Sequence, residues 1–175
     1  MVAGFTIGKN TGGPTSPGSF TNSGDLNDPN ITLYPTGIIG NDSEVALRVS
    51  GSYELPGAVN LAGSLISNNG YPYQSTFTVT RALAAAAGVA LTRATQTVYL
   101  SQRGDERFNN VTMVDVRLSR KFRFGTRGVT PTVDFFNIGN AATVVNLTTG
   151  VGSTYLAPAE ILAPRIIRVG FSVDF

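Results

Sequence analysis

The sequence contains neither cysteine nor histidine. Without cysteine, the chain cannot form a disulfide, a thiolate metal site or a cysteine nucleophile. Without histidine, it lacks the side chain that most often serves as a general base and as a metal ligand. These two absences disfavour an enzyme and a zinc module, and we predict no catalytic residue, no metal site and no cofactor.

Charged residues are also scarce. Lys and Arg number 13 and Asp and Glu number 11, which gives a net charge of +2 and a charged fraction of 14%. A soluble domain carries about 25% charged residues. Because the chain has no basic surplus of the kind that binds phosphate backbones, we expect no nucleic-acid partner. Its 175 residues fit one domain or part of a larger one.

Long apolar runs are missing as well. No stretch reaches the ~18 apolar residues of a membrane-spanning helix, and the most apolar helical candidate, 82–91, is far too short. Residues 1–30 show neither the basic start nor the apolar run of a signal peptide. The sequence therefore leaves two expectations open: a cytosolic protein, or the tail of a longer, exported chain.

What the sequence does contain is an alternation of apolar and polar residues, which predicts β-strands. Five long strands are expected at 44–55, 58–67, 111–124, 129–138 and 165–175, with a possible sixth strand remnant at 2–7. In the first of these, Val45, Leu47 and Val49 share one face. The predicted strands are roughly twice as long as the mean of 5–6 residues in soluble proteins.

Tight turns and long connections alternate along the chain. Pro56-Gly57 and 125–128 are turn signals, whereas 68–109 and 140–163 are long and irregular, with one or two helical turns expected in the Ala-rich part. A loop of some 40 residues is unusual in a compact domain. The pattern predicts short turns at one end of the sheet and long loops at the other.

The apolar faces of these strands need an apolar neighbour, which a second packed sheet or a lipid bilayer can supply. The strand length matches the ~9–11 residues that cross a bilayer at a tilt. The charged opposite face suits a watery lumen, and the alternation of turns and loops is typical of outer-membrane barrels. We therefore predict an all-β fold, an antiparallel meander of about five or six long strands that is the C-terminal part of a transmembrane β-barrel. The alternative is a soluble or secreted β-sandwich that binds through its long loops.

Aromatic residues favour the barrel, because interfacial belts of aromatics are expected there. They fall near the short-turn rim at Tyr53, Phe122, Phe124 and Phe175, and towards the long-loop rim at Phe135, Tyr71 and Tyr73. Arg120 departs from the pattern, because it falls on the apolar face of its strand. Near the short-turn rim, its guanidinium can extend to the lipid headgroups.

Several segments resemble one family. Residues 164–175 (PRIIRVGFSVDF) resemble the last strand of a TonB-dependent outer-membrane receptor. Residues 114–122 (VDVRLSRKF) and 133–140 (VDFFNIGN) resemble further C-terminal segments of that family, and 51–56 and 67–73 resemble the preceding hairpin and its outer loop. The resemblance runs from about residue 42 to residue 175. It is strongest to the large receptors that have a carboxypeptidase-regulatory-like N-terminal domain.

The resemblance implies energy-coupled uptake of a bulky nutrient, such as an iron chelate, cobalamin or a glycan, across the bacterial outer membrane. Residues 44–175 would be the C-terminal barrel segment, and 1–43 an outer loop with a possible strand remnant. The implied partners are outer-membrane lipid, the barrel-assembly machinery, the remainder of the barrel with its plug domain, and TonB through an N-terminal part. Since such receptors have about 22 strands, we expect this chain to be a C-terminal fragment or a truncated reading frame.

The resemblance also assigns roles to individual residues. The outer-membrane assembly signal would comprise Arg168, Gly170, Val173 and Phe175. The polar faces would line the lumen with Arg48, Glu54, Asp115, Arg117, Asp134, Arg168 and Asp174.

Two other motifs depend on the residues alone. Asp115 and Asp134 could act as an acid–base pair, but we favour hydrogen bonds to Arg117 or Arg168. The integrin-like tripeptide Arg103-Gly104-Asp105 is expected to be a loop turn.

Overall fold

The alternating segments form one antiparallel sheet, which a computed structural model describes for residues 1–12, 30, 33–39 and 42–175. The strands of this sheet are β1 (Val2–Ile7), β4 (Val45–Leu55), β5 (Val59–Asn68), β10 (Val111–Arg120), β11 (Phe122–Phe124), β12 (Arg127–Phe136) and β15 (Ile166–Asp174). They pair in the order β1-β4-β5-β10-β12, with β11 and β15 also paired to β12. The predicted all-β antiparallel meander is confirmed, and the strand remnant expected at 2–7 is β1. About half of the segment 1–43, which is expected to be an outer loop, lies outside the described residues, namely 13–29, 31–32 and 40–41.

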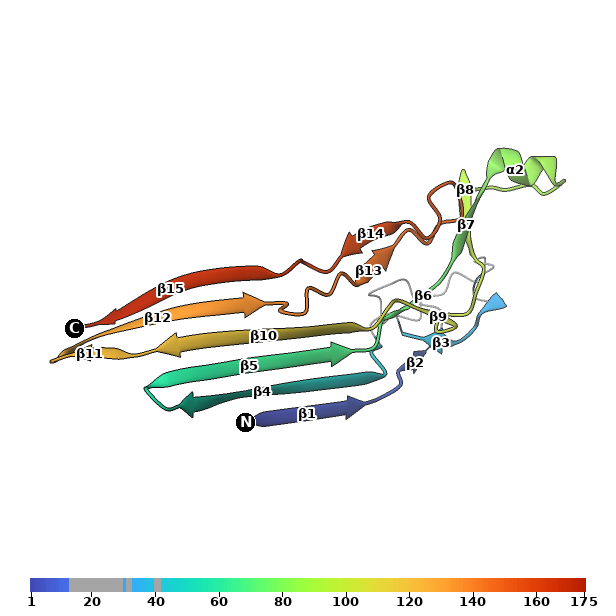
Figure 1. The fold of residues 1–175 in the computed structure, drawn as a ribbon. Coiled ribbons are helices and arrows are strands. Elements are labelled where there is room, and N and C mark those ends of the chain that lie inside the picture. Colours follow the sequence, from blue (N-terminus) through green and yellow to red (C-terminus); the bar gives the residue numbers. More distant parts are fainter. Residues whose placement is uncertain (13–29, 31–32, 40–41) are drawn as a thin grey trace.

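Short turns and long connections lie at opposite ends of the sheet (Figure 1). The β4–β5 turn contains Gly57 and Ala58 with φ of 85° and 57°, and the β11–β12 turn contains Gly125 with φ of 63°. These left-handed conformations suit tight hairpin turns between twisted strands. The C-terminus also lies at this end, which we call the short-turn end, whereas the N-terminus lies beside the middle of β4, where Val2 pairs with Ser50 (Figure 1). The long connections make up the loop end.

The pairing register separates the residues into two faces, because directly opposed residues project to the same side of an antiparallel sheet. One row of opposed residues crosses five strands and is apolar: Tyr53, Leu61, Leu118, Val133 and Val169. The adjacent row in the same strands is mostly polar: Ser52, Ala62, Arg117, Asp134 and Arg168. The alternation of the sequence therefore continues from strand to strand as an apolar face and a polar face.

Neither face of this sheet is covered by another sheet within the part of the chain that is described (Figure 1). Ala84, at the loop end, is the only hydrophobic residue that is buried among the described residues. By contrast, Val169 is 75% exposed and Phe171 77% exposed. The sandwich alternative requires a second layer, and these residues provide none.

One predicted strand, 111–124, is interrupted. β10 ends at Arg120 and β11 begins at Phe122. The register on both sides of the break leaves Arg120 opposite Pro131. Because proline has no N–H to donate to the ladder, the pairing of β10 with β12 stops there and resumes at Phe122, opposite Val129. The prediction of one continuous strand is therefore wrong at this point.

The long connections contain short elements of their own. They are β2 (Thr11–Gly12), β3 (Gly37–Ile38), β6 (Pro72–Tyr73), β7 (Thr76–Thr80), α2 (Arg81–Ala86), β8 (Thr95–Tyr99), β9 (Glu106–Arg107), β13 (Val144–Leu147) and β14 (Pro158–Ile161). The helical turns expected in the Ala-rich segment are α2, whose first turn is capped by the Thr80 hydroxyl, which accepts from the Leu83 N–H at 3.2 Å. None of the helices in the described ranges is both long enough and apolar enough to span a membrane.

Candidate functional site

The strongest cluster of charges lies on the polar face and spans three neighbouring strands. Asp134 of β12 lies between Arg117 of β10 and Arg168 of β15, directly opposite each of them in the register. Arg168 donates from Nε and Nη2 to Asp134 Oδ2 at 2.9 and 2.7 Å. Arg117 donates from Nε to Oδ1 and from Nη2 to Oδ2, the latter at 3.2 Å. The predicted hydrogen bonding of Asp134 to these arginines is confirmed.

This cluster, Arg117–Asp134–Arg168, carries one net positive charge. It lies on the polar face, which no other sheet covers within the described residues. The Asp134 side chain is only 6% exposed, whereas those of Arg117 and Arg168 are 53% and 59% exposed. Arg168 also lies over the Phe136 ring, with Cζ 5.1 Å from the ring centroid. The two guanidinium groups therefore hold the Asp134 carboxylate between them, and both remain about half exposed on the polar face.

The other predicted lumen residues share this face but belong to different rows. The register places Arg48, Glu54, Asp115 and Asp174 on it, opposite Ile66, Asn60, Ser64 and Gly128. Asp174 forms an ion pair with Lys121 at 2.6 Å, near the short-turn end. Asp115 accepts the backbone N–H of Asn137 at 2.9 Å, and both arginines bind Asp134 instead, so the predicted arginine bond of Asp115 is wrong. The structure therefore gives Asp115 and Asp134 separate partners and does not join them as an acid–base pair.

The predicted assembly residues lie along β15 and just beyond it. Arg168 and Gly170 lie on the polar face, and Val173 lies on the apolar face opposite Val129. Phe175 follows the end of the strand and is 95% exposed. Within the described residues β15 pairs with β12 alone, so its other edge presents unpaired backbone groups.

At the loop end, polar side chains tie the long connections together. Asp42 is 1% exposed and accepts from Arg107 Nη2 at 2.9 Å and from the Asn10 N–H at 2.9 Å. Arg107 Nη1 also donates to the Asp42 and Gly70 carbonyl groups, each at 3.1 Å. These bonds join the connection before β4 to the one after β5.

A second group of contacts adds the last long connection. The Ser75 hydroxyl donates to Glu106 Oε2 at 2.9 Å and lies 2.7 Å from the Tyr155 hydroxyl. The pKa of Tyr73, which packs on Phe108 with ring centroids 4.8 Å apart, is raised by its partial burial and, less strongly, by Glu106 and Tyr155. We call residues 69–110 and 137–165, with the described part of 8–44, the loop cluster.

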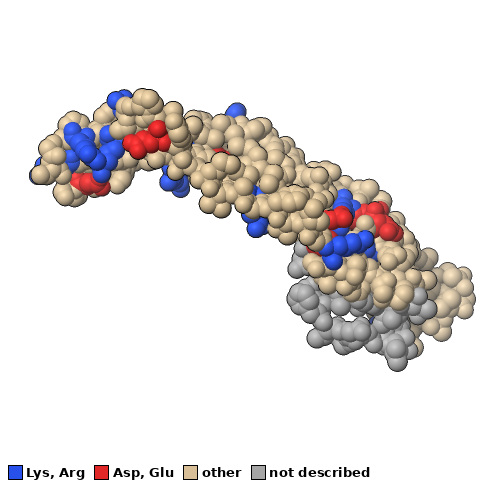
Figure 2. All heavy atoms as spheres, turned by 90° about the horizontal axis from the view of Figure 1, so that it is seen from below, with Lys and Arg blue, Asp and Glu red and all other residues tan. Residues whose placement is uncertain are grey.

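A polar hollow of about 450 Å³ opens in the loop cluster. Its lining includes Lys9, Thr36 and Gln102, together with the predicted turn Arg103-Gly104-Asp105. That turn prediction is confirmed, with Gly104 at a φ of 109°. Among the described residues, no three acidic side chains converge as a metal-ligand set. In the view of Figure 2, charged side chains gather at the two ends of the elongated molecule, with few between them.

Sequence reasoning did not identify the residues that organise the loop cluster. Asn30, for example, is 3% exposed, accepts the Tyr99 N–H at 2.7 Å and donates to the Thr97 carbonyl at 2.9 Å. These partners are nearly 70 positions away in the chain, and a lone Asn carries no local signal for such a contact.

Comparisons with known proteins gave no match: no family model, no curated protein and no solved structure corresponds to this chain.

Proposed function

We propose that this chain is the C-terminal wall and assembly segment of a TonB-dependent receptor in the bacterial outer membrane. In that role it has no catalytic function of its own. It contributes strands, outer loops and an assembly signal to a transporter for a bulky nutrient such as an iron chelate, cobalamin or a glycan. The sequence resemblance from residue 42 to residue 175 supports the family.

The observation that carries the proposal is the uncovered apolar face. Apolar side chains stand opposite one another from β1 to β15 and form a continuous surface. Those of the outer strands, such as Val169 and Phe171, are exposed, and those of the central strands, such as Val133, are half-buried. Patches of more than a few hundred Å² are rare on soluble monomers. Lipid supplies the apolar surroundings that such a face requires, whereas the opposite face, with Arg117–Asp134–Arg168, suits water or a plug domain.

The ends of the sheet support the same arrangement. Outer-membrane barrels have short turns on the periplasmic side and long loops outside, and this sheet separates its turns and loops in the same way. The proposal therefore places Gly57 and Gly125 in the periplasm and the loop cluster outside the cell. The outer edges of β1 and β15 would pair with the remaining strands of the barrel, because unpaired backbone groups are not tolerated in lipid.

An epitope-accessibility experiment tests this topology. The chain is fused to the plug and N-terminal strands of a TonB-dependent receptor, so that the outer edges of β1 and β15 have partner strands. This chimera is produced in a Gram-negative bacterium, and one epitope is inserted after Gly88, between α2 and β8, or after Gly125. We expect the protein in the outer-membrane fraction, the first epitope labelled on intact cells, and the second labelled only after permeabilisation. Recovery from the periplasm as a protein that stays soluble without detergent would instead favour the sandwich alternative and refute the proposal.

A further inference from the structure

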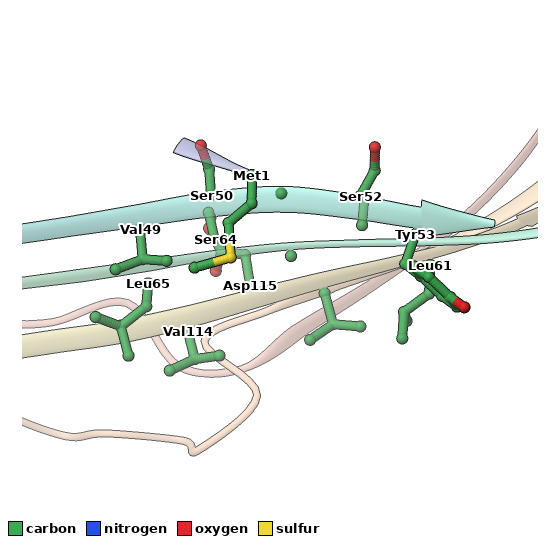
Figure 3. A pocket seen from close by; sticks show the side chains of 14 residues that line it. Met1, Val49, Ser50, Ser52, Tyr53, Leu61, Ser64, Leu65, Val114 and Asp115 are labelled. Carbon is green, nitrogen blue, oxygen red and sulfur yellow. The ribbon is translucent and has the colours of Figure 1, made fainter. Parts of the chain in front are cut away.

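The apolar face has a hollow of about 550 Å³ between β4, β5 and β10. Val49, Tyr53, Leu61, Leu65 and Val114 surround it, and Figure 3 shows their side chains on the opposite side of the strands from Ser50 and Ser52. Met1 borders the hollow on the β1 side. Its flexible thioether chain is 95% exposed and forms a movable border.

Two opposed glycines create this hollow. Gly51 of β4 faces Gly63 of β5, and Gly63 in turn faces Val116 of β10. Neither glycine has a positive φ, so the backbone conformation does not require glycine at either position. Glycine inside a strand weakens it and often marks a place where another group approaches closely. The pair thus leaves space on a face where the neighbouring rows carry bulky side chains.

Arg120 lies on the same face, four residues along β10 from Val116 and nearer the short-turn end. Its guanidinium carbon lies 4.8 Å from the centroid of the Phe122 ring. Its Nη2 lies 3.9 Å from the position that a Cβ on Gly57 would take, so the side chain extends towards the β4–β5 turn. No carboxylate among the described residues forms an ion pair with it.

We propose that the Gly51–Gly63 hollow and Arg120 form one site for an anionic phospholipid of the periplasmic leaflet. The phosphate binds the Arg120 guanidinium, and one acyl chain runs along β10 into the hollow. This inference rests on the proposed function, which puts the apolar face in lipid and the short-turn end at the periplasmic surface.

The dimensions and the chemistry fit this occupant. Four residues of strand span roughly 13 Å, which at a tilt of about 45° is roughly 9 Å of depth, within one leaflet of a hydrocarbon core ~30 Å thick. An acyl chain therefore reaches from a headgroup at Arg120 to the hollow within the same leaflet. Guanidinium binds phosphate through two parallel N–H donors. The Phe122 ring holds the guanidinium in place, and the lack of a carboxylate partner leaves it available for the phosphate.

Native mass spectrometry of the chimera with the remaining receptor strands, extracted from outer membranes in mild detergent, tests the site. Micelles are doped with equal amounts of phosphatidylglycerol and phosphatidylcholine, and the lipid retained per protein is measured. We expect one retained phosphatidylglycerol, and about a tenfold loss of it in Arg120→Gln, since a charge-assisted hydrogen bond is removed. Gly63→Leu should reduce retention to a similar extent, because its side chain fills the hollow, where an added Cβ meets only the Asp115 carbonyl oxygen, at 3.5 Å.

Two matched variants serve as controls. Arg123→Gln removes a charge near the same rim but on the polar face, opposite Gly128. Gly4→Leu adds a side chain in open space on the polar face, opposite Arg48. Both should retain phosphatidylglycerol at the original level. Equal retention of the two lipids, unchanged retention in Arg120→Gln or in Gly63→Leu, or an equal loss in Arg123→Gln would each overturn the inference. The chain would still be recovered from the outer membrane in those cases, so the proposed function is tested separately.

Discussion

Whether the apolar face lies in lipid or in water can be tested by the free-energy cost of an arginine at two positions along one strand, one in its middle and one near the short-turn end. Val169 lies in the middle of β15 and is 75% exposed, and Val173 lies four residues nearer the short-turn end on the same face. In lipid, an arginine costs about 2–4 kcal/mol at the bilayer midplane and ~0–1 kcal/mol near the interface. In water, an exposed substitution costs within about 0.5 kcal/mol at either position.

For Val169→Arg, we therefore expect the folding equilibrium to fall by roughly 30-fold to a thousand-fold, since about 1.4 kcal/mol corresponds to a factor of ten. Val173→Arg should change it by less than about sixfold, because the guanidinium reaches the headgroups. Ser172→Arg, on the polar face opposite Thr130, is the control and should be nearly neutral.

The assay is urea unfolding, in phosphatidylcholine vesicles, of the chimera that supplies the remaining receptor strands, followed by circular dichroism, with the outer-membrane level in cells as a second measurement. If Val169→Arg and Ser172→Arg are equally stable, the face is in water and the reasoning fails. If Val173→Arg is as damaging as Val169→Arg, the face is buried in a dry protein interior, because only a bilayer gives a gradient of cost with depth.

Three further predictions concern the chain end and the loop cluster. Phe175→Ala, made within the parent receptor, should lower the outer-membrane level without changing transcription, and an unchanged surface level would argue against the assembly signal. Arg107→Gln should destabilise the loop cluster by about 3–5 kcal/mol, because it leaves Asp42, at 1% exposure, without its cation; faster proteolysis between β5 and β10 measures this. The pKa of Tyr73 is raised above 10.0, so the folded state holds the phenol neutral. The stability that this raised pKa contributes is present below pH 10.0 and is lost as the pH rises through the folded pKa. Unfolding measured across this pH range, with tyrosinate absorbance reporting the ionisation, should show a smaller loss of stability in Tyr73→Phe.

The sheet was predictable because each strand carries its own two-residue period. Alternation alone placed Arg117, Asp134 and Arg168 on one face, and the register then made them direct neighbours. The interruption at Lys121 was not predictable from that strand, because its cause, Pro131, belongs to the next strand. A proline in a neighbouring strand becomes informative only when the register is known.

The loop cluster was not predictable for a different reason. Its bonds join residues far apart in sequence, such as Ser75 and Tyr155, and the residues involved are ordinary polar types in irregular stretches. The resemblance described an outer loop at 67–73 without indicating that Gly70 would accept from Arg107. Contacts of this kind depend on how three connections of unequal length meet, which no local pattern encodes.

The cross-ties within the loop cluster have a mechanical consequence. Asn30, Arg107 and Tyr155 each join two of the long connections by hydrogen bonds. A force applied to one connection is therefore transmitted to the other two, and the three connections move as one rigid unit. Any bending must then occur where the loop cluster meets the strands of the sheet. At one such junction the backbone N–H of Asn137, which has a φ of 50°, donates to the Asp115 carboxylate of the neighbouring strand β10, so this junction is tied directly to the sheet.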